Sequence, residues 1–349
     1  MLEYKPIEFL ADEFPHHNII EWWYFNGHLI DQPGNHYAFM DCLFKANPKK
    51  VKIPFLRLVP FKEVYFSHTL LSEVDKNKFY SEINPLVLLS RDSFSKDLFF
   101  ANYTSPSLEG YFNYEMVKTS RDQWHLKTPY FDLTLKNKKP PLLVGGKGFV
   151  DLGQNSTYYY SYTDLETSGE VIIDGRRIAV TGQSWMDHQW ADAVYSNFKW
   201  DWFSLQLKNK TEIVCFRFEK NKQVVNLASV ISAQGDQKNY NDVEFIDLGK
   251  SWTSSDTGTA YPLAWRIKIP SANIDLQVEP LVREQEMIFG SINYWEGGLS
   301  VSGRQGNEEI TGRGFMELVG YPSKKSRLNY YRRAFQSRLK ASLKKSPFR

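Results

Sequence analysis

The stretch EVIIDGRRIAVTGQSWMDHQW, residues 170–190, decides the fold class of this chain. Its first half contains two β-branched runs on either side of Asp174-Gly175, a dipeptide that favours a two-residue hairpin turn. Its second half continues as TGQSWMDHQW (181–190), which contains no proline and reads as a further length of strand. The stretch therefore predicts an antiparallel hairpin with a long second strand.

Further strand pairs lie on both sides of this hairpin. They share aromatic and β-branched runs joined by short polar turns: 23–30 with 36–44 across DQPGN, 203–207 with 212–218 across KNKT, and then 223–232. Sequential strands of this kind form a meander, and a meander favours an up-and-down antiparallel barrel. We expect an all-β protein, with a jelly-roll sandwich as the competing architecture.

A faint internal repeat divides the chain. TGQSWMD (181–187) resembles TGRGFME (311–317), and EWWYF (21–25) resembles WDWFS (200–204) when Trp23 is set on Trp202. Each half then opens with a tryptophan-bearing strand and closes with a TGxx strand. The repeat predicts four parts: an N-terminal arm (1–20), a first barrel (21–198) closed by strand 181–190, a second barrel (199–322) and a tail (323–349).

The charge of the chain is concentrated in that tail. The formal net charge of the 349 residues is +3, yet residues 323–349 contain ten Lys and Arg and no acidic residue. Apolar residues recur at spacings of three and four in the tail: Leu328, Tyr331, Phe335, Leu339 and Leu343. This pattern predicts a basic amphipathic helix that binds an anionic membrane surface or an acidic partner. The alternative is a tail that packs on the body or is disordered. No basic patch elsewhere indicates nucleic-acid binding.

Several classes of protein are excluded or disfavoured. No apolar run approaches the ~18 residues of a transmembrane helix, and the N-terminus lacks the features of a signal peptide, so we expect a cytoplasmic protein, peripheral on a membrane if the tail binds one. Two cysteines, Cys42 and Cys215, make no disulfide framework. His16 and His17 have no third ligand at metal spacing, and no nucleotide motif is present, so no cofactor is expected.

Residues 182–190 are the strongest candidate for chemistry. On a strand, side chains alternate between two faces: Met186, His188 and Trp190 on one, and Trp185, Asp187 and Gln189 on the other. A polar pair flanked by large apolar residues is costly to bury. Asp187 is therefore predicted to act as a general acid with a raised pKa, and His188 as a general base. The alternative is a structural Asp–His pair hydrogen-bonded to the backbone at a barrel rim.

These motifs together resemble a known family. The segments are GQSWMDHQW, EWWYFNGHL (21–29), YYYSYTDLETSGEV (158–171), WDWFSLQL (200–207), YWEGGLSVSG (294–303) and GFMELVGY (314–321). They resemble the hydroxyneurosporene synthase and AttH-like lipocalin family, which includes the carotenoid 1,2-hydratases and is similar to fungal decalin-forming Diels–Alderases. The resemblance covers about residues 20–322 and implies two lipocalin-like barrels packed side by side.

The resemblance also implies roles for single residues. The D-H-x-W motif of the family matches Asp187, His188 and Trp190, and the hydratases need the His and Trp for water addition. The hydratases also use a carboxylate and a Tyr on the next strand pair, where this chain has Cys215 and Arg217. This departure puts the hydratase reaction itself in question.

Other residues are expected to contact the substrate. They lie in the tryptophan-rich and tyrosine-rich strands or at the departing positions: Trp185, Trp190, Glu21, Trp23, Tyr160, Tyr162, Trp200, Asp201, Cys215 and Arg217. Water addition to an alkene needs an acid, aromatic faces that stabilise a cation, and a base for the water. Trp23 and Trp202 are alternatively plugs for the barrel ends.

The sequence thus predicts a cofactor-independent enzyme that acts on a long apolar substrate, an isoprenoid such as a carotenoid or a polyketide. The expected reaction is acid–base addition of water to a C=C bond, or cyclisation. The first alternative is a non-catalytic carrier of lipid or isoprenoid, because lipocalin-like barrels also hold ligands unchanged. A carbohydrate-binding sandwich with tryptophan platforms is a third. Whether the pocket lies within one barrel or between two, and the oligomeric state, are left open.

Overall fold

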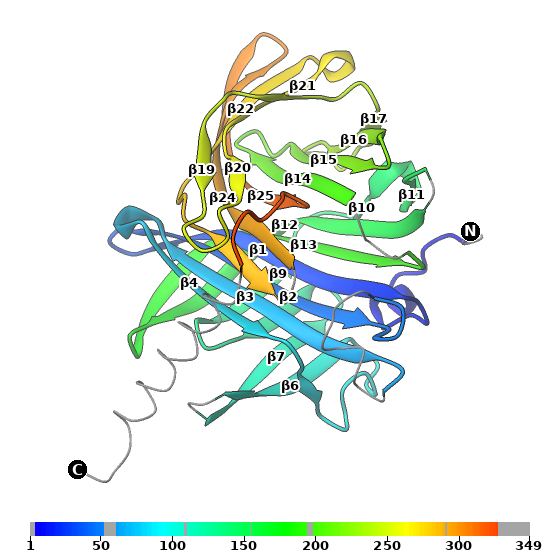
Figure 1. The fold of residues 1–349 in the computed structure, drawn as a ribbon, viewed down its shortest axis with the longest axis vertical. Coiled ribbons are helices and arrows are strands. Elements are labelled where there is room, and N and C mark those ends of the chain that lie inside the picture. The colour runs from blue at the N-terminus through cyan, green and yellow to red at the C-terminus, as the bar shows by residue number, and fades with distance from the viewer. Residues whose placement is uncertain are drawn as a thin grey trace.

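The computed structural model describes residues 4–51, 61–107, 110–153, 155–193, 198–289 and 292–326 (Figure 1). Over these ranges the chain forms two large antiparallel sheets and one small sheet of two strands, and no α-helix. The expected all-β fold is confirmed. The predicted helix of the basic tail lies almost wholly in residues 327–349, outside the described residues. No helix of the described part is long and apolar enough to cross a membrane.

Sheet one has the strand order β4-β3-β2-β1-β13-β12-β9-β8-β7-β6-β5, with β10 and β11 also paired to β12. Neighbours along most of this path are consecutive in sequence, as a meander predicts and a jelly roll does not. The strands are β1 (Ile20–Asp31), β2 (His36–Ala46), β3 (Val64–Glu73), β4 (Lys78–Asn84), β5 (Leu88–Leu89), β6 (Phe100–Ser107), β7 (Gly110–Ser120), β8 (Gln123–Lys127), β9 (Phe131–Asn137), β10 (Leu142–Leu143), β11 (Phe149–Asp151), β12 (Ser156–Ile173) and β13 (Arg176–Ala191).

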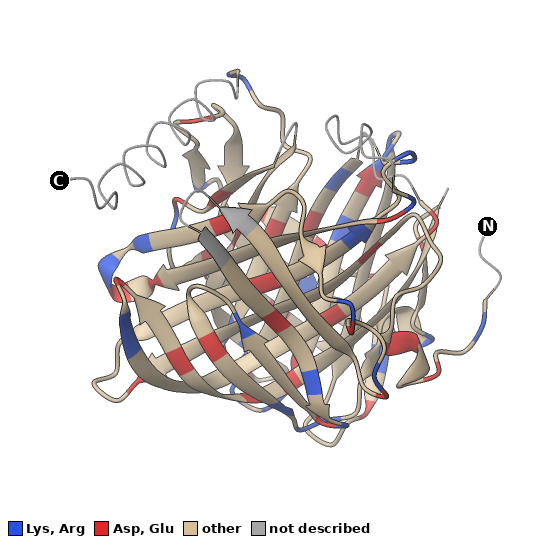
Figure 2. Cartoon of the chain, turned by 90° about the horizontal axis from the view of Figure 1, so that it is seen from below, with Lys and Arg blue, Asp and Glu red and all other residues tan. Residues whose placement is uncertain are grey.

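Sheet two has the order β17-β16-β15-β14-β25-β24-β22-β21-β18, with β23 on β24, and β19 pairs with β20 in the small sheet. Both large sheets curl into half-barrels (Figures 1 and 2). The strands are β14 (Phe198–Leu207), β15 (Glu212–Lys220), β16 (Gln223–Ile231), β17 (Gln237–Tyr240), β18 (Glu244–Asp247), β19 (Ser251–Thr253), β20 (Ala260–Pro262), β21 (Trp265–Ile269), β22 (Ile274–Pro280), β23 (Glu286–Phe289), β24 (Ile292–Gln305) and β25 (Glu308–Val319).

The predicted hairpin at residues 170–180 is confirmed. Ile173 pairs with Arg176 across the turn, and the register continues to Tyr158 opposite Trp190, with one irregularity between Tyr162 and Leu165. Asp174 and Gly175 have φ of 51° and 76°, which is the left-handed backbone that a two-residue hairpin turn of this kind requires. The strand pairs predicted at 203–218 and 223–232 are also present.

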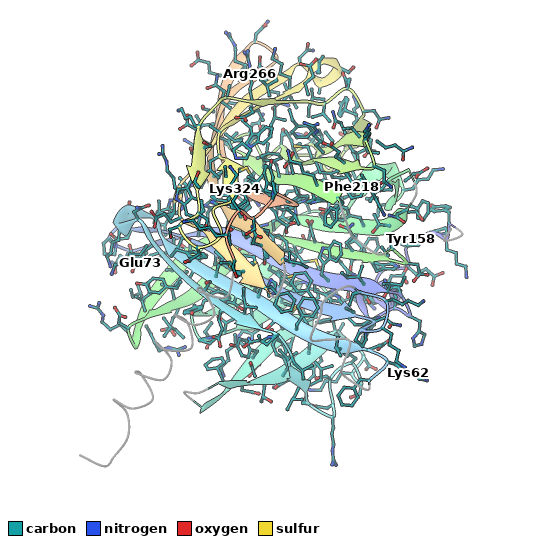
Figure 3. All side chains as sticks on the ribbon, viewed as in Figure 1. Lys62, Glu73, Tyr158, Phe218, Arg266 and Lys324 are labelled. Atoms are coloured by element: carbon teal, nitrogen blue, oxygen red, sulfur yellow. The ribbon has the colours of Figure 1, made fainter. Side chains whose placement is uncertain are left out.

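Side chains alternate between the interior of each sheet and a core between the two sheets. The interior of sheet one contains Trp23, Met186 and Trp190. The interior of sheet two contains Phe203 and Cys215. The third core joins the sheets face to face, and Figure 3 shows side chains of both sheets filling this space. Its members include Tyr24, Tyr159, Trp185, Trp200, Trp202 and Phe315.

The repeat has a register that corrects the sequence alignment. β13 and β25 each return to pair with the first strand of their own sheet, so that Tyr24 lies opposite Asp187 and Trp202 lies opposite Glu317. When the two halves are aligned so that Asp187 matches Glu317, the residue that matches Trp202 is therefore Tyr24 and not Trp23. A shift of one residue turns a side chain to the other face of its strand. Trp23 accordingly lies inside sheet one, whereas Trp202 lies between the sheets.

Candidate active site

Asp187 and His188 leave β13 on opposite faces, as strand alternation predicts. Trp185, on the face of Asp187, belongs to the core between the sheets, and Met186 and Trp190, on the face of His188, belong to the interior of sheet one. The structure therefore does not bring the predicted acid and the predicted base together. Each lies in a polar network of its own.

Asp187 accepts three hydrogen bonds in the core between the sheets. Tyr159 donates to Oδ2 at 2.5 Å, and Ser161 and Trp185 donate to Oδ1 at 2.5 and 2.6 Å. Trp202 of sheet two donates to the Tyr159 hydroxyl at 2.8 Å, which links the two sheets. Burial raises the pKa of Asp187 to about 7, although the three donors favour its charged form. Near neutral pH the carboxyl can therefore both give and take a proton.

Two glutamates of sheet two face the same core. Glu296 on β24 lies directly opposite Glu317 on β25, and the Tyr24 hydroxyl of sheet one donates to Glu296 Oε1 at 2.8 Å. Burial and the neighbouring Glu317 raise the pKa of Glu296 well above its usual range. Burial also raises the pKa of Glu317, to about 7. Two carboxylates this close do not both ionise readily, so near neutral pH the pair holds a proton.

We call Asp187, Glu296 and Glu317 the acid cluster. The charge of Asp187 contributes to the raised pKa of both glutamates, so the three carboxyls interact across the sheet boundary. Sequence reasoning missed Glu296 and Glu317. The repeat contained the signal for Glu317, because TGRGFME places Glu317 where TGQSWMD places Asp187.

The core that contains the acid cluster has a border of partly buried side chains, several of them aromatic. Trp22, Phe44, Phe198 and Val319 pack on the core between the sheets and are only partly buried. Glu317 also retains some exposed surface. The Tyr24 and Trp202 rings meet edge to face at 5.4 Å beside the cluster. Aromatic side chains thus surround carboxyl groups that titrate near neutral pH, the combination that acid–base chemistry on an apolar molecule needs.

His188 belongs to a second network, inside sheet one. Glu21 Oε1 accepts from His188 Nε2 at 2.9 Å and from His16 Nδ1 at 2.7 Å, while Lys45 donates to Oε2 at 3.0 Å. Although burial opposes it, hydrogen bonds from His16 and His188 lower the pKa of Glu21 to about 2. Burial lowers the pKa of His188, against the attraction of Glu21. His188 Nδ1 lies 3.1 Å from the Tyr160 hydroxyl.

This network fastens the N-terminal arm over the interior of sheet one. The His16 ring stacks on Trp190 at a centroid distance of 4.0 Å. Glu13 of the arm is buried and accepts from Tyr162 at 2.9 Å and from Lys118. Both carboxylate oxygens of Glu21 accept hydrogen bonds from side chains of the protein itself. We therefore read the network as structural and as the anchor of the arm.

One group of side chains in the described ranges lies close enough together to hold a metal ion: His16, Glu21 and His188. Their ligand atoms all lie within 4.8 Å of one another. The expectation that His16 has no third ligand nearby was therefore wrong, because Glu21 and His188 converge on it. The donor set nevertheless does not fit a resident divalent cation. Glu21 Oε1 accepts from both rings and Oε2 accepts from the buried Lys45 ammonium. A metal ion would displace these bonds beside a fixed positive charge.

Replacing Glu21 with glutamine is expected to destabilise the protein by about 3–5 kcal/mol, because it removes the buried counter-charge of Lys45 and leaves only the partly exposed Glu63 carboxylate, 3.9 Å away. Urea unfolding measures this loss. Glu166→Gln is the matched control: its ion pair with Lys138 is exposed to solvent, so its loss is expected to leave the stability almost unchanged. Equal stabilities of the two variants would contradict the structural role of the network.

The remaining predicted residues fall in three places. Trp23, Tyr160 and Tyr162 lie inside sheet one with Glu21, His188 and Trp190. Trp185 and Trp200 lie between the sheets with Asp187. Cys215 lies inside sheet two, where Asp201 pairs opposite Arg217. The sequence grouped these residues into one site, and the structure separates them.

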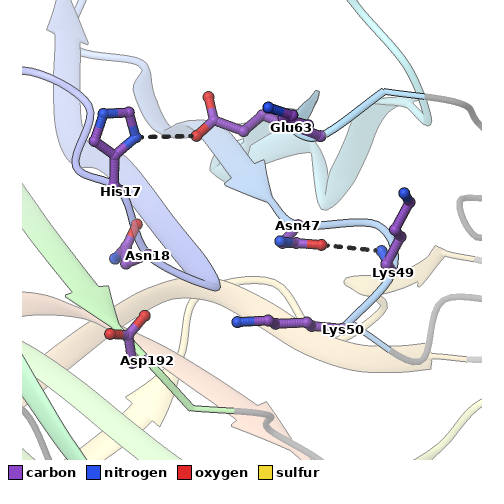
Figure 4. A pocket seen from close by; sticks show the side chains of 8 residues that line it. His17, Asn18, Asn47, Lys49, Lys50, Glu63 and Asp192 are labelled. Carbon is purple, nitrogen blue, oxygen red and sulfur yellow. Dashed lines mark hydrogen bonds and ion pairs between the residues drawn. The ribbon is translucent and has the colours of Figure 1, made fainter.

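A surface pocket of about 250 Å³ lies beside the arm (Figure 4). His17 faces Glu63 there at 3.8 Å, and Asn47 Oδ1 accepts from the backbone N–H of Lys49 at 3.1 Å. Lys50 and Asp192 complete a charged lining. Such a lining does not suit a long apolar substrate, so the acid cluster remains the stronger candidate.

Two curled antiparallel sheets, packed face to face over buried carboxyl groups, define a lipocalin-like protein with a candidate acid–base site. Within that class, the chain belongs to the AttH-like family, whose match covers residues 1–321.

A curated relative is the dehydratase asqC of Emericella nidulans, 27% identical over 203 residues. That match covers 54% of this chain and 58% of the relative, so the chain spans less than two thirds of its length.

Three solved structures share the fold. An AttH protein from Nitrosomonas europaea superposes with a TM-score of 0.72 at 24% identity, over 92% of this chain and 99% of that one. Kievitone hydratase from Nectria haematococca superposes with a TM-score of 0.69 at 17% identity, over 87% of this chain and 89% of that one. CghA superposes with a TM-score of 0.53 at 12% identity, over 88% of this chain and 89% of that one. At these identities the likeness is one of fold.

Proposed function

We propose that this protein is a cofactor-independent lyase that removes water from, or adds water to, an apolar small molecule at the acid cluster. The observation that carries the proposal is the acid cluster itself: Asp187 and Glu317 have pKa values raised to about 7 by burial, in a core of aromatic side chains. Groups that titrate near the working pH are the most effective proton donors and acceptors.

In the direction of dehydration, Asp187 protonates the hydroxyl oxygen of the substrate. The C–O bond breaks and water leaves. Glu317, ionised and paired with protonated Glu296, takes the proton from the neighbouring carbon, and the C=C bond forms. Hydration is the same path reversed. The faces of Tyr24 and Trp202 stabilise positive charge that develops on carbon.

The relatives support this reaction class. The match to a protein named as a dehydratase extends over about half of the chain, and one protein of the same fold is named as a hydratase. Water loss and water addition share one transition state, so both names fit one set of acid–base groups. We infer a substrate that is long and apolar, an isoprenoid or a polyketide, from the aromatic border of the cluster.

Mass spectrometry of organic extracts tests the proposal. The purified protein is incubated with extracts of a polyene-rich host and of a polyketide-producing host. We expect a species that differs from its precursor by one water, present with the natural protein and absent with Asp187→Asn. Asp236→Asn, at an exposed turn, is the control and should behave as the natural protein. An unmodified apolar molecule that co-purifies with all three proteins would favour the carrier instead.

A further inference from the structure

The interior of sheet two opens into a pocket that the acid cluster does not use. The pocket has a volume of about 380 Å³, within the range of small-molecule sites. Lys199 and Arg217 contribute positive charge to its lining, Asp247 contributes one carboxylate, and Phe245, Trp265 and Tyr321 contribute aromatic surface.

The two halves of the repeat differ at interior positions of their first and last strands. The register that sets Asp187 on Glu317 and Tyr24 on Trp202 also sets Trp23 on Asp201. By the same offset, His188 corresponds to Leu318 and Trp190 to Gly320. In sheet one, His188 stacks between neighbours in a filled interior. In sheet two the matching positions hold smaller side chains.

Polar groups at this pocket lack hydrogen-bond partners. Asp201 is fully buried, and its Oδ1 accepts from the Tyr321 hydroxyl at 2.8 Å, while its Oδ2 has no hydrogen bond. The Lys199 ammonium lies 3.6 Å from that Oδ2. Arg217 lies opposite Asp201 in the sheet; its guanidinium reaches Glu219 at 3.2 Å, but its buried Nε has no acceptor. Burial raises the pKa of Asp201.

The C-terminal end of the described chain completes the wall. Tyr321 follows β25 and packs against the interior core of sheet two, with its ring 4.3 Å from the Lys199 ammonium. The backbone N–H of Lys324 donates to the Thr257 carbonyl at 2.9 Å, which holds this segment in place. The aromatic wall is therefore supported by the fold.

We propose that this pocket is a second binding site, separate from the acid cluster, for a small aromatic carboxylate. The carboxylate accepts from the Lys199 ammonium and the Arg217 guanidinium, the two cations of the lining. The aromatic ring lies between Phe245, Trp265 and Tyr321. An aromatic acid matches the two cations and the aromatic wall together, which neither an inorganic anion nor a neutral lipid does.

Isothermal titration with 2-naphthoate tests the site, with 2-naphthalenemethanol as the neutral analogue. We expect 2-naphthoate to bind and the alcohol to bind at least about tenfold more weakly, because the alcohol lacks the charge that Arg217 and Lys199 contact. Arg217→Met and Lys199→Met should each weaken 2-naphthoate binding about tenfold or more. Lys250→Met, whose exposed ammonium pairs with Glu279, is the control and should leave the affinity unchanged.

Asp187→Asn separates this site from the acid cluster. If the proposal is right, that variant binds 2-naphthoate as the natural protein does. Absence of binding overturns the proposal, as does equal binding of the alcohol. So does an affinity that depends on Asp187 but not on Lys199. Lys199 is partly exposed, so its methionine variant is expected to fold even where Arg217→Met does not.

Discussion

Replacing Asp187 with asparagine should lower kcat/KM by about 10²–10⁴-fold while the fold stays intact. Asparagine has the shape of the carboxyl and still accepts hydrogen bonds from Ser161 and Trp185 on one oxygen. It has no proton to give to a leaving hydroxyl. The rate is measured on the substrate that the mass-spectrometric screen identifies, and circular dichroism checks the fold.

The matched control is Asp41→Asn. Asp41 is also fully buried and burial also raises its pKa to about 7, but it lies on the same face of β2 as Phe39 and Leu43, which line the interior of sheet one. Its Oδ1 accepts from Thr69 at 2.8 Å, away from the acid cluster. If a raised pKa and burial alone sufficed, both variants would lose activity. We expect only Asp187→Asn to do so; full activity in that variant would end the proposed mechanism.

The fold could be predicted from the sequence because its signals are local. Alternation of apolar residues and the Asp174-Gly175 turn specify the β12–β13 hairpin without any long-range information. The face of each residue in 185–190 also follows from strand period. The alignment of Trp23 with Trp202 was wrong by one residue, because it paired two residues of the same type without knowledge of the strand register. Only the hydrogen-bonded register shows that Tyr24 occupies the matching position.

The candidate site was only half predictable for the same reason. Asp187 stands out in the sequence because it lies among large apolar residues. Glu296 lies in the segment YWEGGLS. Nothing in that segment shows that Glu296 faces Glu317 on the neighbouring strand and Tyr24 of the other sheet. Glu21 contacts His188, which lies 167 residues further along the chain, and also binds His16 of the arm. Such convergence depends on tertiary structure, which strand period does not encode.

Asp201 and Arg217 lie apart from Asp187 because successive residues of a strand point to opposite faces of the sheet. On β14, Trp200 and Trp202 face the other sheet, so the residue between them faces the interior of sheet two. The sequence placed all of them in one pocket. The structure instead places Asp187 on the face of the core between the sheets and Asp201, opposite Arg217, within sheet two.

Replacing Glu317 with glutamine should stabilise the protein by about 2–3 kcal/mol at about pH 8, and this gain should vanish near pH 4. The pKa of Glu317 is raised from 4.5 to about 7 in the folded state by burial and by Asp187. The folded protein thus holds a proton that the unfolded chain has released. Stability from this group is complete below about pH 4.5 and declines as pH rises through 7. Glutamine is neutral throughout and avoids that loss.

Urea unfolding at the two pH values measures this effect, with Glu308→Gln as the control. Glu308 is exposed on the same strand, so its variant should show no stability gain that grows with pH. Glu317→Gln should also lose activity, since the amide cannot take the substrate proton. A gain in stability coupled to a loss of turnover is the signature of a carboxylate retained for chemistry. If Glu317→Gln is instead destabilised at pH 8, the carboxylate is an ordinary structural acceptor and the acid cluster loses its proposed base.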